Sequence, residues 1–181
     1  LIIDEVQTGM GRTGTLFSFE QFGLSPDIVT LAKGLGGGYP IGAFMATDDV
    51  AACFNPGDHG TTLGGNALAA AVGNAIFDEI FAAELLSNVA ERSSQLLAGL
   101  EKIAEETGAI ADIRGLGLLV GVQFKDHVPA NDVLAACHDE NMLVVTAKHN
   151  VIRLLPPLNV SAAEVDEALQ KFEAALKKVS Q

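Results

Sequence analysis

Residues 28–38 read IVTLAKGLGGG, an apolar run that ends in Lys33 and leads into a series of glycines. A similar run opens the chain, because residues 1–4 read LIID and place Asp4 directly after three apolar residues. Neither run alternates with polar residues, which is typical of strands in a sheet covered on both faces. The pattern predicts an α/β fold in which a carboxylate and an amine lie at the ends of neighbouring strands.

A lysine and a carboxylate in this arrangement are the two groups that pyridoxal 5'-phosphate (PLP) chemistry requires. The lysine forms a Schiff base with the cofactor, and the carboxylate partners the pyridinium nitrogen. Taken singly, Asp4 is equally explained as a turn or cap carboxylate, Lys33 as a solvated surface charge and the glycines as a flexible turn. An acid that ends a buried run needs a partner, however, and the glycines keep side chains away from the lysine. The pair therefore predicts a PLP-dependent enzyme.

The composition narrows the possible partners. The chain has 181 residues, 49% of them hydrophobic, and a net charge of −12. This charge argues against nucleic acid or an anionic membrane as the main partner, and no apolar run is long enough to span a bilayer. Cys53, Cys137 and the four histidines lack metal-ligand spacing, so we expect no metal site and a reduced, cytoplasmic protein. Because Leu1 already lies in an apolar run, we expect a fragment whose N-terminal part, with any targeting signal, is missing.

Hydrophobic periodicity predicts two parts. The first, residues 1–75, is expected to be the C-terminal remainder of a parallel α/β domain, and residues 76–181 a compact α+β domain. Strands are expected at 1–4, 28–32, 41–47, 118–124, 142–146 and 151–155. Helices are expected at 16–22, 67–81, 85–107 and 129–140, and from Ser161 to the C-terminal residues. Ser161 and Glu164 have the spacing of a capping box at the start of the last helix.

Five runs match one known family in the order in which that family carries them. They read LIIDEVQTGMGRTG at 1–14, SPDIVTLAKGLGGGYPIGA at 25–43, HGTTLGGNALAAA at 59–71, DIRGLGLLVG at 112–121 and VIRLLPPL at 151–158. The chain therefore resembles the C-terminal portion of a class III (ornithine/acetylornithine-type) aminotransferase of PLP fold type I. The resemblance implies that residues 1–75 complete a large PLP-binding domain with a parallel-rich sheet, and that residues 76–181 form the small C-terminal domain.

The resemblance also implies a role for each matching residue. Asp4 keeps the pyridine nitrogen of PLP protonated, while Lys33 forms the Schiff base and carries a proton between the substrate α-carbon and the cofactor. Val6 packs on the ring face, and Gln7 hydrogen-bonds the phenolic oxygen. Thr62 reaches the phosphate of the neighbouring subunit, which makes the active site shared across a homodimer. The alternative for Thr62 is a cap of the helix that follows it.

Arg153 lies inside the apolar run VIRLL, where a guanidinium needs an anion and its planar fork fits a carboxylate. The resemblance implies that Arg153 binds the substrate α-carboxylate, and a structural ion pair is the alternative because the chain has 23 acidic residues. Arg114 also matches the family but receives no catalytic role. Asn66 is followed by Ala67 where the family usually has proline, which we expect to loosen the helix start slightly.

The implied reaction is ping-pong transamination between an amino acid and a 2-oxo acid. The amino group of N-acetylornithine, or of a similar ω-amino donor, passes through the cofactor to 2-oxoglutarate and gives glutamate, in arginine biosynthesis. Ornithine, succinylornithine and 4-aminobutyrate stay open as donors, because most residues that read the distal end lie upstream in relatives. Alone, the chain is expected to be inactive.

Two readings from other classes compete with the aminotransferase. Gly9, Gly11 and Gly14 have the G-x-G-x-x-G spacing of a dinucleotide-binding oxidoreductase. A non-catalytic fragment that serves as an interaction piece is the second. The presence of both Asp4 and Lys33 argues against a degenerate site, since a non-catalytic protein has no need of the lysine.

Overall fold

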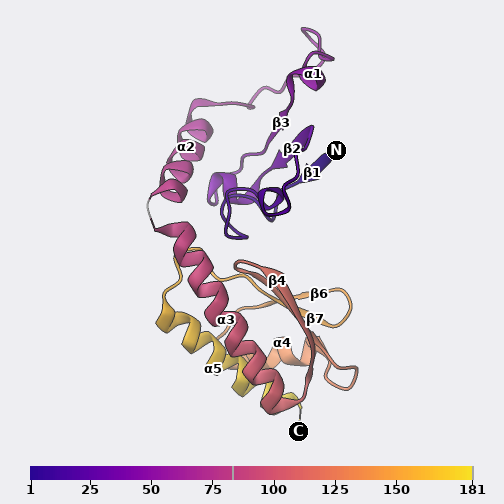
Figure 1. Ribbon diagram of the computed structural model, residues 1–181, viewed down its shortest axis with the longest axis vertical. Coiled ribbons are helices and arrows are strands. Elements are labelled where there is room, and N and C mark those ends of the chain that lie inside the picture. Colours follow the sequence, from indigo (N-terminus) through magenta and orange to yellow (C-terminus); the bar gives the residue numbers. More distant parts are fainter. Residues whose placement is uncertain (83, 181) are drawn as a thin grey trace. The chain divides into compact units, whose positions relative to one another are not determined.

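The computed structural model describes residues 1–82 and 84–180. The chain divides into two compact units, which we call the N-terminal unit (Leu1–Leu86) and the C-terminal unit (Ser87–Gln181). Both combine helices with a sheet, so the predicted α/β class is confirmed (Figure 1).

The N-terminal unit is built on a three-stranded sheet in the order β1-β2-β3. Strands β1 (Ile2–Asp4) and β2 (Ile28–Leu31) run parallel, while β3 (Ala43–Ala46) runs antiparallel to β2. Strands occur where the apolar runs predicted them, and the sheet is mixed because β3 returns alongside β2 after the glycine turn. Its remaining elements are η1 (Ser18–Phe22), η2 (Lys33–Gly36), α1 (Asp48–Ala51) and α2 (Ala67–Phe81).

Helix α2 has the bounds that its alanine-rich sequence predicts. The side chain of Asn66 caps it, because its Oδ1 accepts a hydrogen bond of 2.9 Å from the Ala69 backbone amide. Its small residues allow close packing: a Cβ placed on Gly73 would lie 3.8 Å from the backbone oxygen of Leu35 in η2. Asn66 therefore fixes the helix start without the proline that the family usually carries at the next position.

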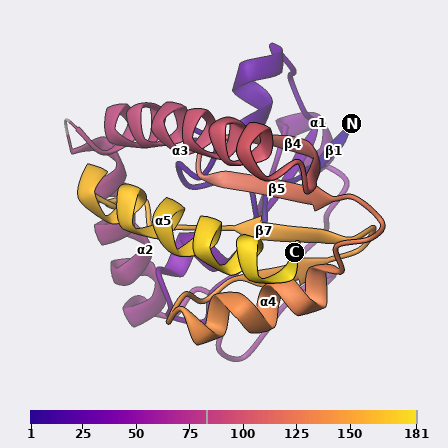
Figure 2. The same ribbon diagram turned by 90° about the horizontal axis from the view of Figure 1, so that it is seen from below.

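The C-terminal unit contains a four-stranded antiparallel sheet in the order β4-β5-β7-β6. Its helices are α3 (Leu85–Thr107), α4 (Ala130–Asp139) and α5 (Ala162–Val179), and Figure 2 shows α5 between the other two, in front of β7. The strands are β4 (Ile110–Leu116), β5 (Leu119–Phe124), β6 (Val145–Ala147) and β7 (Val151–Leu154). The predicted capping box of Ser161 and Glu164 begins α5.

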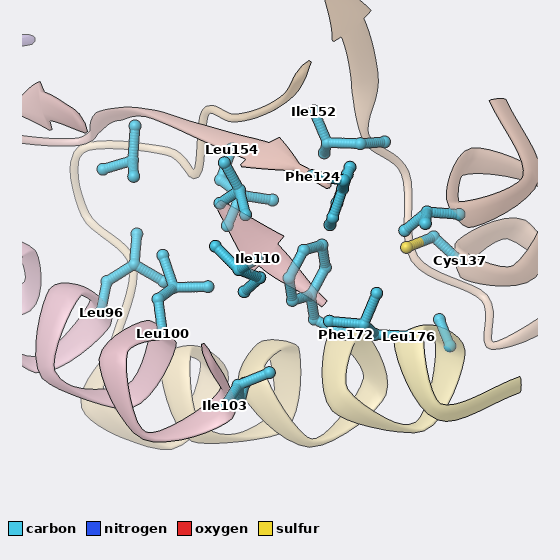
Figure 3. Close-up of a cluster of buried hydrophobic side chains, with 14 of the residues drawn as sticks. Leu96, Leu100, Ile103, Ile110, Phe124, Cys137, Ile152, Leu154, Phe172 and Leu176 are labelled. Atoms are coloured by element: carbon cyan, nitrogen blue, oxygen red, sulfur yellow. The ribbon is translucent and has the colours of Figure 1, made fainter. Parts of the chain in front are cut away.

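The core of this unit lies between the helices and one face of the sheet. The side chains of β5 alternate between half-buried and buried, so that Val120, Val122 and Phe124 enter the core. Figure 3 shows Phe124 close to Phe172 of α5, and their ring centroids are 6.3 Å apart. The apolar stripe that the sequence predicts on α3 and α5 supplies the other side of this core.

Two strands of this sheet differ from the sequence-based expectation. Strand β4 was not predicted, because the charges of Asp112 and Arg114 and the glycine at 115 interrupt its apolar pattern. It lies at the edge of the sheet, where charged residues are tolerated. The strand expected at 142–146 instead spans Val145–Ala147, so that prediction was wrong by three residues at its start.

No helix among residues 1–82 and 84–180 is long and apolar enough to cross a membrane. In the same part of the chain, no group of three or more histidine, cysteine or acidic side chains is placed to hold a metal ion. Cys53 and Cys137 are both free thiols.

Candidate active site

Asp4 and Lys33 lie at the same edge of the N-terminal sheet. Asp4 is the last residue of β1, and Lys33 begins η2 two positions after β2 ends. Because β1 and β2 are parallel, their carboxyl ends meet at one edge, which is where open α/β sheets bind their ligands. The structure therefore brings these two predicted residues to the same edge of the sheet.

The Asp4 carboxylate is fixed by two hydrogen bonds to a single oxygen. Its Oδ1 accepts from the Val6 backbone amide at 2.9 Å and from the Thr30 hydroxyl at 3.0 Å. These two bonds lower the pKa of Asp4 below its ordinary value of 3.8. Desolvation acts in the opposite direction, and the positive charge of Lys33 lowers the pKa further. Asp4 is exposed, and the partners that an acid at this position was expected to need are the Val6 amide and the Thr30 hydroxyl.

Lys33 occupies an unusual backbone conformation. Its φ of 44° lies in the left-handed region, which residues other than glycine rarely adopt. The preceding Ala32 is extended, and its carbonyl accepts a hydrogen bond of 2.9 Å from the Leu35 amide, which closes the first turn of η2. Strained backbone of this kind is concentrated at functional sites, where the surrounding structure stabilises it. The geometry is therefore consistent with a functional lysine.

Two of the glycines that follow Lys33, Gly36 and Gly37, lie close to other side chains. A Cβ on Gly36 would lie 2.6 Å from Cγ2 of Ile41, and a Cβ on Gly37 would lie 2.5 Å from Cδ1 of Ile76 in α2. Gly37 also has a positive φ of 53°. The first part of the turn is therefore packed against its neighbours, whereas a Cβ on Gly38 would have no atom within 4 Å.

A buried carboxylate organises the loop between β1 and η1. Glu5 is 1% exposed, and its side chain accepts hydrogen bonds from the Thr8 hydroxyl at 2.5 Å, the Ser18 hydroxyl at 2.6 Å and the Phe19 amide at 3.0 Å. Burial acts to raise the pKa of Glu5, but these donors outweigh it and the pKa is lowered. Glu5 therefore fixes the start of the loop that follows β1. Val6, which is half-buried, and Gln7, which is exposed, lie in this loop.

Thr62 lies in the loop before α2, where its side chain is exposed. The cap of α2 is provided by Asn66, four residues later, so the interpretation of Thr62 as the helix cap is wrong. Within residues 1–82 and 84–180, no hydrogen bond links Thr62 to Asp4 or Lys33. Its hydroxyl is thus available at the surface of the N-terminal unit.

Arg153 belongs to the C-terminal unit. It is half-buried in β7, where its cross-strand neighbours are Gly121 of β5 and Val145 of β6. It also borders an apolar cavity of about 330 Å³ between the end of β7 and α5. Arg114 lies opposite Gly121 on the other side, and its guanidinium binds Asp112 at 2.5 Å and Gln123 at 2.7 Å. Arg114 thus has local partners that account for its charge.

The family model described as aminotransferase class-III matches residues 1–176, almost the entire chain. The chain belongs to the class-III aminotransferases. It is 48% identical over 178 residues to an acetylornithine aminotransferase of Clostridium acetobutylicum, a match that covers 98% of this chain and 46% of that protein. The chain thus spans about half the length of the curated relatives it matches.

Solved structures of class-III aminotransferases share the fold. The N-acetylornithine aminotransferase of Stenotrophomonas maltophilia aligns with a TM-score of 0.88 and 39% identity, over 98% of this chain and 47% of that one. An ornithine delta-aminotransferase of Plasmodium falciparum aligns with a TM-score of 0.93 and 34% identity, over 99% and 46% of the two chains. These matches support the predicted fold as part of a PLP-transferase of fold type I.

The competing dinucleotide-binding motif does not form its structural unit. A dinucleotide fold requires an α-helix directly after the glycines, with the pyrophosphate at its N-terminus. In this class-III chain, residues 6–13 form turns, and the next element is the five-residue 3-10 helix η1. Gly9 instead allows a close backbone approach, since a Cβ there would lie 2.9 Å from the Glu5 carbonyl oxygen.

Sequence reasoning did not identify Glu5 and Thr30 as part of this site. The signal that could have identified Glu5 is its position next to Asp4 at the end of a strand, where successive side chains point to opposite faces. Thr30 carried no such signal. Its contact with Asp4 depends on the register of β1 against β2, which joins residues 26 positions apart.

Proposed function

We propose that this class-III aminotransferase, in its full-length form, is PLP-dependent. It would transfer the amino group of N-acetylornithine, or of a similar ω-amino donor, to 2-oxoglutarate and produce glutamate in arginine biosynthesis. The observation that carries the proposal is the position of Asp4 and Lys33 at one edge of the parallel pair β1 and β2. Because the chain spans about half of its relatives, residues outside it would complete the site.

The chemistry of the residues suits PLP. Asp4, whose lowered pKa keeps it ionised at neutral pH, would partner the protonated pyridine nitrogen, and the Lys33 amine would hold the cofactor's aldehyde carbon. The close packing around Gly36 and Gly37 leaves no room for side chains at the turn beside the lysine. When bound, PLP would supply the electron sink that stabilises negative charge at the substrate carbon that carries the transferred amino group.

The remaining residues of the N-terminal unit have supporting roles in this proposal. Val6 would pack on the ring face, and Gln7 would hydrogen-bond the phenolic oxygen. Thr62, exposed and not engaged as a helix cap, would bind the phosphate held by a second subunit, so that the site is shared in a homodimer. Lys33 would move a proton at the substrate carbon that carries the transferred amino group. Residues 1–75 would belong to the large domain, and residues 76–181 to the small one.

Arg153 would bind the α-carboxylate of the amino-acid substrate. Its guanidinium provides two parallel donors for a carboxylate, and the glycine opposite it in β5 presents no side chain that would compete for space. The names of the relatives support an acetylornithine-type donor. Ornithine, succinylornithine and 4-aminobutyrate are the alternatives within the family, and a solved ornithine aminotransferase is similarly close in fold. We place the enzyme in the cytoplasm, in keeping with its two free thiols.

Borohydride reduction tests the cofactor and the lysine together. The full-length protein is incubated with PLP, reduced and mapped by peptide mass. We expect a phosphopyridoxyl group on Lys33, no label in Lys33→Ala, and an unchanged label in Lys148→Ala, which removes an exposed lysine elsewhere. A folded protein that is labelled at other lysines, or not at all, would refute the proposal.

A donor screen tests the substrate. With 2-oxoglutarate as acceptor, N-acetylornithine is expected to give the highest kcat/KM. Arg153→Lys is expected to raise KM for every donor that carries an α-carboxylate, because a lysine cannot form the bidentate contact. A clear preference for 4-aminobutyrate, which lacks an α-carboxylate, would contradict both assignments.

A further inference from the structure

We propose that Thr30 is a positioning residue of this site, whose hydroxyl fixes the Asp4 carboxylate in the orientation that the cofactor's ring nitrogen requires. The inference rests on the proposed function, since Thr30 acts through the role of Asp4. It adds to the aminotransferase site a residue that neither the family match nor the motifs single out.

The register of the sheet places the two side chains together. Thr30 is the cross-strand partner of Asp4, and its Oγ1 donates to Asp4 Oδ1 at 3.0 Å. The neighbours of Thr30 in β2, Val29 and Leu31, are both 4% exposed and point into the core of the N-terminal unit. Thr30 therefore faces the opposite side, together with Asp4.

Thr30 joins the two halves of the site through its backbone as well. Its carbonyl accepts a hydrogen bond of 2.9 Å from the Glu5 amide, directly after Asp4. The side chain of Glu5 is buried and anchored by its own donors, so the chain that leads to Val6 leaves β1 in a fixed direction. The Val6 amide and the Thr30 hydroxyl then converge on the same oxygen of Asp4, which limits rotation of the carboxylate.

The hydroxyl also affects the charge of Asp4. Hydrogen bonds from Val6 and Thr30, in this order, lower the pKa of Asp4. The charged groups nearby are Lys33 of η2, which lowers that pKa further, and Glu5, whose carboxylate is engaged by Thr8, Ser18 and Phe19. Removing the hydroxyl of Thr30 takes away one of the two bonds, so the pKa of Asp4 rises and Asp4 is protonated at higher pH.

The test compares Thr30→Val, which removes the hydroxyl but keeps the branched shape suited to a strand, with Thr30→Ser, which retains it. The dissociation constant of PLP is measured for the full-length protein by absorbance titration between about pH 4 and 8. The acidic end of this range is where carboxyl groups titrate. We expect Thr30→Val to weaken PLP binding roughly three- to tenfold at neutral pH. The acidic midpoint of binding should move to higher pH in Thr30→Val and stay unchanged in Thr30→Ser.

Thr30→Ala is the second variant without the hydroxyl, and it should show the same shift. Equal midpoints in Thr30→Val, Thr30→Ser and the unmodified protein would overturn the inference while leaving the proposed function intact. If the midpoint shifts in Thr30→Val but not in Thr30→Ala, the effect comes from the shape of the valine side chain, and the inference is also overturned. An unmodified protein that fails to bind PLP would instead refute the proposed function, a result that the borohydride label on Lys33 reports separately.

Discussion

Replacing Glu5 with alanine should destabilise the full-length protein by about 2–4 kcal/mol. Glu5 is 1% exposed and accepts hydrogen bonds from Thr8 of the loop and from Ser18 and Phe19 of η1. A buried donor that loses its acceptor costs about 1–3 kcal/mol. The two hydroxyl donors, Thr8 and Ser18, are half-buried and regain water in part, which keeps the total below the sum of the separate penalties.

The assay is the melting temperature of the PLP-free protein by calorimetry. A loss of this size corresponds to a decrease of roughly 4–16 °C for a unit of 150–250 residues. The control is Glu101→Ala, which removes an exposed carboxylate of α3 and should change stability by less than about 0.5 kcal/mol. Glu5→Gln retains the shape and one acceptor but adds an amide donor that faces existing donors, so it should fall between the two.

The stabilising contribution of Glu5 depends on pH. The pKa of Glu5 is lower in the folded protein than its ordinary value of 4.5, so its contribution is present above pH 4.5. It is lost as the pH falls through the folded pKa. The difference in melting temperature between the unmodified protein and Glu5→Gln should be constant near neutral pH and decrease below pH 4.5. A Glu5→Ala protein that melts with the Glu101→Ala control, or a difference that increases in acid, would refute the argument.

Two further predictions concern the C-terminal unit and use the same melting assay. Gly115→Ala should destabilise the β4–β5 hairpin by more than about 2 kcal/mol, because a Cβ there would lie 2.1 Å from the carbonyl oxygen of Leu119. The control, Gly60→Ala, should leave the stability unchanged, because a Cβ at Gly60 would have open space around it. Equal melting temperatures would show that the hairpin adjusts. Phe172→Ala should cost about 3–5 kcal/mol because the ring is fully buried, while Phe22→Ala, at 63% exposure, should cost far less. Similar losses for both would contradict the assigned core.

The elements that the sequence predicted well are those with a strong local signal. Helix α2 and the capping box of α5 follow from alanine content and from the spacing of Ser161 and Glu164, which are properties of adjacent residues. Strand β4 escaped prediction because an edge strand has little need of an apolar pattern and can carry charges on both sides of Ile113. The antiparallel direction of β3 could not be predicted either, since direction is a property of pairing between strands.

In the candidate site, too, residues with a local sequence signal could be predicted and contacts between distant residues could not. Asp4 and Lys33 could be predicted because each ends an apolar run, and parallel strands bring such ends to one edge. The support around them depends on contacts between distant residues. Ser18 reaches Glu5 across 13 positions, and Thr30 reaches Asp4 across 26. No spacing pattern in the sequence indicates either contact, so both could be found only in the structure.

The left-handed backbone of Lys33 has a consequence for how this site can change over generations. A residue with a side chain pays about 1 kcal/mol to adopt that conformation, whereas glycine adopts it freely. The fold by itself would thus favour glycine at position 33, whereas the proposed chemistry favours lysine. If Lys33 has the proposed role, stability and activity are opposed at this single position, and a lineage released from selection for catalysis would gain stability by replacing the lysine with glycine.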